Sequence, residues 1–339
     1  MSVLGLGTMT FGAESDEATS DAILDRFAAS GGTLIDTADV YSAGRSEEIV
    51  GRWLATQPDQ GRFVIATKGR FSMGEGPSNS GAGRAHLMRA VDASLRRLQV
   101  DVIDLYQVHC SDAETPIEET LEALDDLVRA DKVRYVGLSN YTGYQFARAA
   151  TTARLQQLTR IVSLQAQYSL LERTIELDLV PACLDEGAGI LPWSPLGGGW
   201  LTGKYAPDRL PTGATRLGED PTRGVEAYEL RNTDRTWKII EACSTIATKH
   251  AVALSVVALA WLRDRPAVCS VILGTRSLQQ LDENLQASDF ELSPDEREFL
   301  DQASAPGIPL YPHGFIERYG GNRVWERMAT RNEPPPIGA

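Results

Sequence analysis

Cysteine is scarce in this chain of 339 residues, and long apolar runs are missing. The 4 cysteines are Cys110, Cys183, Cys243 and Cys269. They are far apart and form no CxxC pair, which argues against a disulfide framework or a zinc site and favours a reducing, cytoplasmic compartment. The longest apolar run, Ala251 to Leu262, is shorter than the about 20 residues that span a bilayer, so it predicts a buried helix.

Positive charge is also in short supply. The chain has 33 basic against 46 acidic residues and a net charge of −13, which argues against nucleic acid or an anionic membrane as a general partner. A local cationic pocket remains compatible with this balance.

The first residues, MSVLGLGTMTFG, lack a basic segment ahead of an apolar stretch and predict a strand rather than a signal peptide. No GxGxxG motif follows that strand, which argues against a doubly wound dinucleotide-binding fold.

Short apolar runs alternate with amphipathic stretches along the chain. Strands are predicted at residues 3–7, 34–35, 63–67, 102–108, 133–138, 161–164, 190–193 and 271–273. Helices are predicted at residues 15–30, 47–54, 85–98, 117–130, 144–158, 177–186, 234–250 and 254–263, with Ser46 as the N-cap of the second. Regular alternation of this kind predicts parallel strands, and eight of them predict an α/β fold, the (β/α)8 TIM barrel.

The length alone allows one large domain or two ordinary ones, but no linker divides the chain. We therefore expect a single barrel over residues 1–310, with a long loop after the seventh strand, from Gly197 to Thr233, and a C-terminal extension over residues 311–339. The extension ends near Pro334–Pro336, a run that favours an extended chain.

Polar or aromatic side chains follow every predicted strand, where the active sites of parallel barrels are assembled. They are Thr8, Asp36, Lys68, His109, Ser139–Asn140, Gln165, Trp193–Ser194 and Thr275–Arg276. Each has an ordinary structural explanation by itself: Asp36 could cap a turn, Lys68 could be solvated and His109 could be a core histidine. Together they favour an active site in which Tyr41, just past the second strand, is the reacting acid. Its unperturbed pKa of about 10 requires a nearby cation such as Lys68.

These motifs resemble the aldo-keto reductase superfamily in order and over nearly the whole chain. The matching segments are GLGTMTFG from Gly5, IDTADVYSAGRSEE, IATKG, DLYQVH, VGLSNY, LQAQYS, PWSPLGGGWLTGKY and LGTRSLQQLDEN, which ends at Asn284. The resemblance implies a barrel that binds a nicotinamide dinucleotide across its mouth without a Rossmann domain. It also implies a catalytic tetrad of Asp36, Tyr41, Lys68 and His109.

The implied reaction is hydride transfer between the nicotinamide and the carbonyl carbon of an aldehyde or ketone, with Tyr41 as the general acid that forms the alcohol. Lys68 is expected to lower the pKa of Tyr41, and Asp36 to hold and neutralise Lys68. His109 either orients the substrate oxygen or relays a proton. The possible walls of the substrate pocket are Met9, Phe11, Tyr41, His109 and Trp200.

The resemblance also implies a cofactor site. Ser139, Asn140 and Gln165 correspond to residues that hold the carboxamide, and Trp193 to the aromatic residue that stacks on the nicotinamide. The pyrophosphate positions are Ser194, Leu196, Leu201, Gly203 and Lys204. The remaining cofactor positions are Thr8, Met9, Gly274, Thr275, Arg276, Gln280, Glu283 and Asn284. The segment from Gly197 is expected to be either a lid over the cofactor or a plain surface loop.

The sequence departs from the best-known family pattern at the adenosine end. Ile272–Thr275 replaces Ile-Pro-Lys-Ser, and Gln280 replaces a later arginine. Arg276 would supply the missing charge for a 2′-phosphate, which favours NADP(H) over NAD. The hairpin that closes the bottom of the barrel in the family is not evident before the first strand, so the chain is either truncated or without it, which would leave apolar barrel residues open to water.

Two other functions use the same fold. A regulatory subunit of potassium channels keeps the tetrad, binds the cofactor and turns over slowly, and it would present a large exposed patch to its channel. A catalytically dead barrel is disfavoured by the intact tetrad. We therefore expect an NADPH-dependent reductase whose partner is a small carbonyl compound. The identity of that compound and the oligomeric state stay open.

Overall fold

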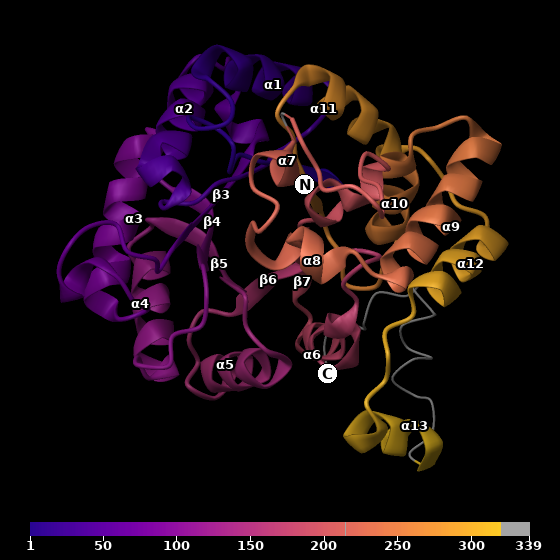
Figure 1. Cartoon of the computed structure of the whole chain (residues 1–339). Helices are drawn as coiled ribbons and strands as arrows, with labels where there is room; N and C mark the ends of the chain where they lie inside the picture. Colours follow the sequence, from indigo (N-terminus) through magenta and orange to yellow (C-terminus); the bar gives the residue numbers. More distant parts are fainter. Residues whose placement is uncertain (214, 320–339) are drawn as a thin grey trace.

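The computed structural model describes residues 1–213 and 215–319 (Figure 1). Its strands are β1 Leu4–Gly7, β2 Leu34–Asp36, β3 Val64–Gly69, β4 Ile103–Val108, β5 Val133–Ser139, β6 Ile161–Gln167, β7 Gly189–Trp193 and β8 Val271–Gly274. They form one 8-stranded parallel sheet in the order β7-β6-β5-β4-β3-β2-β1-β8. Ile190 in β7 bonds to the chain just before β8, through Ala267 O at 2.6 Å and Cys269 N at 2.9 Å. The sheet is therefore a nearly closed (β/α)8 barrel, as predicted.

The barrel is surrounded by helices (Figure 1). They are α1 Glu17–Ala29, α2 Arg45–Ala55, α3 Arg84–Leu98, α4 Ile117–Arg129, α5 Gly143–Leu155, α6 Leu179–Glu186, α9 Asp234–His250, α10 Leu254–Arg263, α11 Leu278–Leu285 and α12 Pro294–Ser304. Their apolar faces pack on the strands; on α4, for example, Leu121, Leu124 and Leu127 are buried. Helices α11 and α12 were not predicted, although Ser293 and Glu296 form a capping box at the start of α12.

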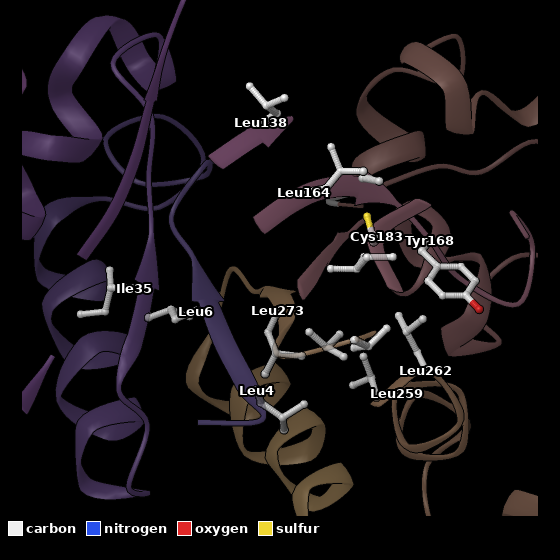
Figure 2. Packing of buried hydrophobic residues seen from close by; sticks show 14 of the residues in the cluster. Leu4, Leu6, Ile35, Leu138, Leu164, Tyr168, Cys183, Leu259, Leu262 and Leu273 are labelled. Carbon is white, nitrogen blue, oxygen red and sulfur yellow. The ribbon is translucent and has the colours of Figure 1, made fainter. Parts of the chain in front are cut away.

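The apolar core has two parts. A small cluster lies inside the barrel and consists of Leu34, Ala66, Leu105, Leu191 and Ile272. The larger cluster lies between the strands and the helices; in Figure 2, Leu6 lies beside Ile35 of β2, while Leu273 lies on the side of Leu259 and Leu262 of α10. No residue of this inner cluster is more than 6% exposed, so these five apolar residues are closed to water in this structure.

Glycines in β1 make room for that inner cluster. A methyl group at Gly5 would lie 2.8 Å from Leu34 Cδ2, and one at Gly7 would lie 2.8 Å from Ile272 Cγ2. Any larger side chain at these positions would collide with the barrel interior. The GLG of the first motif is therefore explained by packing.

The segment between β7 and α9 contains η5 Gly197–Thr202, α7 Arg216–Glu219, η6 Gly224–Glu226 and α8 Tyr228–Arg231. Trp200 anchors it: the side chain is fully buried, stacks on Tyr228 at 5.5 Å between ring centroids, and meets the edge of Tyr205. Its indole N–H donates to the carbonyl of Glu226 at 3.0 Å. This segment is thus a packed structure and not a plain surface loop.

Beyond α12 the chain leaves the barrel and ends its described part in α13, Phe315–Tyr319 (Figure 1). Residues Leu310–Gly314 form a helical turn, so the start of the extension is not extended as expected. The rest of that prediction, including Pro334–Pro336, lies outside the described residues. Among the described residues no single helix has the length and apolarity to cross a membrane; α9 and α10 pass such a test only as a pair bent by 104°.

Candidate active site

At the mouth of the barrel the buried Lys68 contacts both Asp36 and Tyr41. Lys68 Nζ lies 2.7 Å from Asp36 Oδ2 and 3.3 Å from Tyr41 OH, and it donates to the carbonyl of Thr37 at 2.8 Å. The side chains of Lys68 and Asp36 are 0% and 3% exposed. The other carboxylate oxygen of Asp36 accepts from Gln165 Nε2 at 2.8 Å. The phenol, ammonium and carboxylate predicted from the sequence are therefore in one hydrogen-bonded group.

The imidazole of His109 stands beside this group. Its ring lies 5.8 Å from the ring of Tyr41 at an angle of 79°, and Phe71 meets it at 4.7 Å. Burial, followed by the positive charges of Lys68 and Arg70, lowers the pKa of His109 to about 3. The imidazole is therefore neutral near pH 7, and its Nδ1 is buried without a partner in the described part of the chain.

Two opposing effects set the pKa of Tyr41. Burial raises the pKa of Tyr41 above its ordinary value, and the nearby Lys68 opposes this shift without cancelling it. Burial lowers the pKa of Lys68, but Asp36 and Tyr41 together raise it by more, so the amine stays an ammonium ion. Lys68 thus lowers the pKa of Tyr41 as expected, but burial outweighs it, and in this structure Tyr41 is a protonated phenol.

An unusual turn carries Tyr41. After it, Ser42, Ala43 and Gly44 all have positive φ, at 48°, 54° and 94°. Only Gly44 adopts this conformation without strain. Ser42 Oγ fixes the turn by donating to the carbonyl of Phe11 at 2.8 Å.

Ser46 has a different role from the predicted N-cap. Helix α2 begins at Arg45, with Gly44 at the N-cap position. The hydroxyl of Ser46 instead lies 2.7 Å from that of Thr8 and 2.9 Å from that of Thr37, beneath the active site. It ties the ends of β1 and β2 together, a contact that no local sequence pattern reveals.

A cleft of about 640 Å³ runs across the mouth and includes Asp36, Tyr41 and His109 in its lining. The predicted cofactor residues that line it are Met9, Ser139, Asn140, Gln165, Trp193, Ser194, Leu196, Lys204, Gly274, Thr275, Arg276, Gln280, Glu283 and Asn284. Thr8, Leu201 and Gly203 are outside its lining, and the first two are fully buried. Phe11 and Trp200, expected as pocket walls, are also fully buried in the core, so that expectation is wrong.

Asn140 organises the end of the cleft that lies next to His109 and Trp193. Its side-chain N–H groups donate to His109 O at 2.9 Å and Ser139 Oγ at 3.1 Å, while its oxygen accepts from Trp193 Nε1 at 3.1 Å. Asn140 and Ser194 both have positive φ, at 55° and 53°. Strained backbone of this kind is retained where the surrounding structure holds a site in place.

The opposite end of the cleft contains charged residues that the sequence analysis missed. Glu14, from the loop after β1, lies 2.8 Å from Arg276 and 2.5 Å from Arg223. Arg276 also contacts Glu219 of α7 at 3.0 Å. These four residues, which we call the outer charge cluster, connect the segment after β7 to both sides of the cleft.

Two nitrogen atoms near that cluster have no partner within the described part of the chain: Arg276 Nη2 and Arg216 Nε, both buried. Lys204 lines the same cleft as these two arginines. Burial, followed by the positive charges of Arg276 and Arg216, lowers the pKa of Lys204. In a chain with a net charge of −13, such a concentration of cations is a local exception. These donors fit a phosphate group, which accepts several charged hydrogen bonds at once.

A comparison of the sequence with known families matches the profile described as "Aldo/keto reductase family" over residues 3–305. The chain is 36% identical to an uncharacterized oxidoreductase, YrpG, of Bacillus subtilis, over 86% of this chain and 89% of that protein. It is 35% identical to the protein tas of Escherichia coli, over 87% and 92%. It is also 32% identical to a probable voltage-gated potassium channel subunit beta of rice, Oryza sativa, over 83% and 85%.

Proposed function

The chain belongs to the aldo/keto reductase family, and from this membership we propose that it is an NADP(H)-dependent oxidoreductase that reduces an aldehyde or ketone to an alcohol. The observation that carries the proposal is the contact of Lys68 Nζ with Tyr41 OH at 3.3 Å and with Asp36 at 2.7 Å, inside a cleft of about 640 Å³. A phenol paired with a buried cation is suited to giving a proton to a developing alkoxide.

When bound, the nicotinamide supplies the hydride. The side chains of the site supply the proton, stabilise the charge that develops and hold the reacting groups in place. Tyr41 holds the proton, because burial keeps its pKa above the ordinary value. As that proton moves to the substrate oxygen, the ammonium of Lys68 stabilises the phenolate that is left. Asp36 fixes the position of Lys68, and the neutral His109 can accept or donate a hydrogen bond at the substrate oxygen without adding charge.

The preference for NADP(H) rests on the cations at the outer end of the cleft. The unpartnered Nη2 of Arg276 and Nε of Arg216 offer N–H groups to a 2′-phosphate or a pyrophosphate. Lys204 adds a third cation there. Ser139, Asn140, Gln165 and Trp193 at the other end would hold the carboxamide and the ring. The carbonyl substrate would then enter next to Tyr41 and His109.

A second function is suggested by the rice relative: a cofactor-binding regulatory subunit with slow turnover. The tetrad is compatible with both, so the rate of turnover separates them. Rapid oxidation of NADPH by simple aldehydes favours the reductase. Tight binding of NADPH with slow turnover of every carbonyl compound tried favours the regulatory subunit.

The test of the leading proposal is NADPH oxidation over a panel of aldehydes and ketones, comparing the wild type with Tyr41→Phe. We expect kcat to fall at least about a hundredfold, within the range of about 10²–10⁴ for loss of a general acid, because the substituted ring keeps its shape but has no proton to give. Quenching of NADPH fluorescence should report unchanged cofactor binding. The matched control is Tyr144→Phe, whose ring is 72% exposed, and it should not change kcat. Undiminished turnover in Tyr41→Phe would reject Tyr41 as the proton donor.

A further inference from the structure

Asp39 is a fully buried carboxyl that the mechanism above leaves without a use. It lies between β2 and the turn that carries Tyr41. Its backbone N–H donates to the carbonyl of Lys68 at 3.0 Å, and the N–H of Tyr41 donates to Ala38 O at 3.2 Å. Asp39 is therefore bonded through its backbone to the lysine of the tetrad, and it stands two residues before the tyrosine.

The side chain of Asp39 belongs to a polar layer outside the barrel, between strands β3 and β4 and helices α2 and α3. The charged and titratable groups that face it are Glu47 from α2, Arg97 from α3, Tyr106 from β4 and the more distant Lys68 from β3. Glu47 takes the one arginine: Arg97 Nε donates to it at 2.6 Å, and Thr67 Oγ1 donates to its other oxygen at 2.5 Å. Among the described residues that face Asp39, both cations are therefore already paired, Arg97 with Glu47 and Lys68 with Asp36.

Neither carboxyl oxygen of Asp39 accepts a hydrogen bond of ordinary geometry within the described part of the chain. The backbone N–H of Val40 lowers the pKa of Asp39, but by less than burial raises it. The hydroxyl of Tyr106, also fully buried, is without a partner as well. The two groups lie over the same glycine: a methyl group at Gly69 would be 2.3 Å from Tyr106 OH and 3.0 Å from Asp39 Oδ2.

A buried carboxylate without donors costs several kcal/mol, whereas the neutral acid has an O–H of its own to give. Burial, followed by the negative charge of Glu47, raises the pKa of Asp39 to about 7. Geometry and charge therefore agree that this group carries a proton below neutral pH and releases it as the solution becomes alkaline.

We propose that Asp39 is a positioning residue for Tyr41 that works in its protonated form: the neutral carboxyl is tolerated in this buried layer beside Tyr106 and keeps the turn that carries the catalytic phenol in place, and ionisation loosens that turn. A carboxylate formed here would be repelled by Glu47. The two cations nearby could not neutralise it, because Arg97 is bonded to Glu47 and Lys68 to Asp36. The turn that follows Tyr41 is already strained, so it has little reserve against such a change. This inference rests on the proposed reductase function.

No member of the tetrad with a shifted pKa competes with this titration near neutral pH. His109 is neutral down to about pH 3, and the pKa values of Tyr41 and Lys68 lie above their ordinary values of 10.0 and 10.5. A fall in kcat around pH 7 that is absent from Asp39→Asn therefore reports Asp39. The effect on stability has the same sign. Asp39 has an ordinary pKa of 3.8 and a folded pKa of about 7, so its contribution to stability is lost as the pH rises between these values.

The experiment measures kcat and KM with NADPH and benzaldehyde between about pH 6 and about pH 9, for the wild type and Asp39→Asn, which imitates the neutral carboxyl. We expect kcat of the wild type to fall about tenfold over this range and kcat of Asp39→Asn to stay nearly constant, with NADPH binding equal in both. Asp101→Asn, which removes one exposed negative charge, is the matched control and should follow the wild type.

Glu47→Gln provides a second variant in case Asp39→Asn does not fold. It removes the repelling charge and releases Arg97 toward Asp39, so the fall in kcat should move to lower pH. Superimposable kcat profiles of the wild type and Asp39→Asn, or an unmoved profile in Glu47→Gln, would overturn the proposal. A purely structural role would change melting temperatures with pH and leave kcat untouched.

Thermal melting needs no turnover, and it separates this inference from the proposed function. The melting temperature of the wild type should fall relative to Asp39→Asn as the pH rises from about 5 to about 8. Identical trends reject Asp39 as the proton holder even in a protein that reduces no carbonyl compound. Absence of turnover together with the expected difference in melting rejects the reductase alone.

Discussion

Two ion pairs of nearly equal length sit at opposite ends of the same cleft. Lys68 and Asp36 are 2.7 Å apart with side chains 0% and 3% exposed, whereas Arg276 and Glu14 are 2.8 Å apart with both side chains 20% exposed. The inner pair is surrounded by the barrel and by the amide of Gln165. Each partner of the outer pair has a second partner, Glu219 for Arg276 and Arg223 for Glu14.

The two pairs differ in how deeply they are buried and in whether each partner has a second ion-pair partner, and they hardly differ in distance. Removing one member of a buried pair leaves a charge that water cannot reach, so the inner pair has a single stable arrangement. In a partly exposed cluster a carboxylate can be exchanged for water or for another anion at a smaller cost. The inner pair is suited to holding a reacting phenol in place, and the outer cluster to releasing its arginines to a phosphate.

The largest expected effect comes from breaking the inner pair. Asp36→Asn keeps the shape of the side chain but leaves the ammonium of Lys68 buried without an anion. We expect the free energy of unfolding to fall by about 3–5 kcal/mol, as for other broken buried pairs, and the activity to be lost with it. Urea denaturation measures the first of these. The same substitution in the outer pair, Glu14→Gln, should cost less than about 1 kcal/mol, and an equal loss in both variants would contradict the comparison.

The next largest effect concerns selectivity between cofactors. Arg276→Gln removes a guanidinium that we expect to bind the 2′-phosphate. The Kd of NADPH should rise about 10–100-fold, the equivalent of one strong charged hydrogen bond or two, while the Kd of NADH should change little. Fluorescence titration with both cofactors measures this. Equal losses for NADPH and NADH would instead indicate that Arg276 serves the pyrophosphate or the structure of the cleft.

The smallest effect tests the competition inside the outer cluster. In Glu14→Gln, Arg276 and Arg223 lose a competing carboxylate, so NADPH should bind up to about fivefold more tightly, since exposed pairs contribute at most about 1 kcal/mol. The gain should shrink at high salt, which screens the exposed charges. NADH, without the 2′-phosphate, serves as the control ligand. Weaker binding of NADPH by this variant would mean that Glu14 orders the arginines and does not compete for them.

Much of the fold was predictable because its signals are local. Apolar runs in regular alternation predicted all eight strands, and the polar residues near their C-terminal ends, together with the resemblance to the family, predicted the group of Asp36, Tyr41, Lys68 and His109. The helices α11 and α12 were missed even though Ser293 and Glu296 carry a readable capping signal. Ser46 was misassigned because the turn before it is left-handed, a conformation that distant contacts such as Ser42 with Phe11 impose.

Other properties required the folded chain. Trp200 resembles a pocket wall in the sequence, but its burial against Tyr228 depends on how the segment after β7 folds back. Glu14 and Arg223 are 209 positions apart, and no local pattern pairs them. The lowering effect of Lys68 on the pKa of Tyr41 was predictable, but the net rise was not, because desolvation depends on all the atoms around the phenol and outweighs that one cation.

By itself, then, the sequence determined which strands form the barrel and which polar residues stand at their ends, because strand periodicity and strand-end position are properties of neighbouring residues. Only the tertiary structure decided the charge states and the partners. Asp36 and Asp39 differ by three positions in the chain, yet Asp36 faces a lysine inside the barrel and Asp39 faces an occupied arginine outside it. Burial and electrostatic environment are sums over segments that meet only in the folded protein, so they cannot be predicted from neighbouring residues.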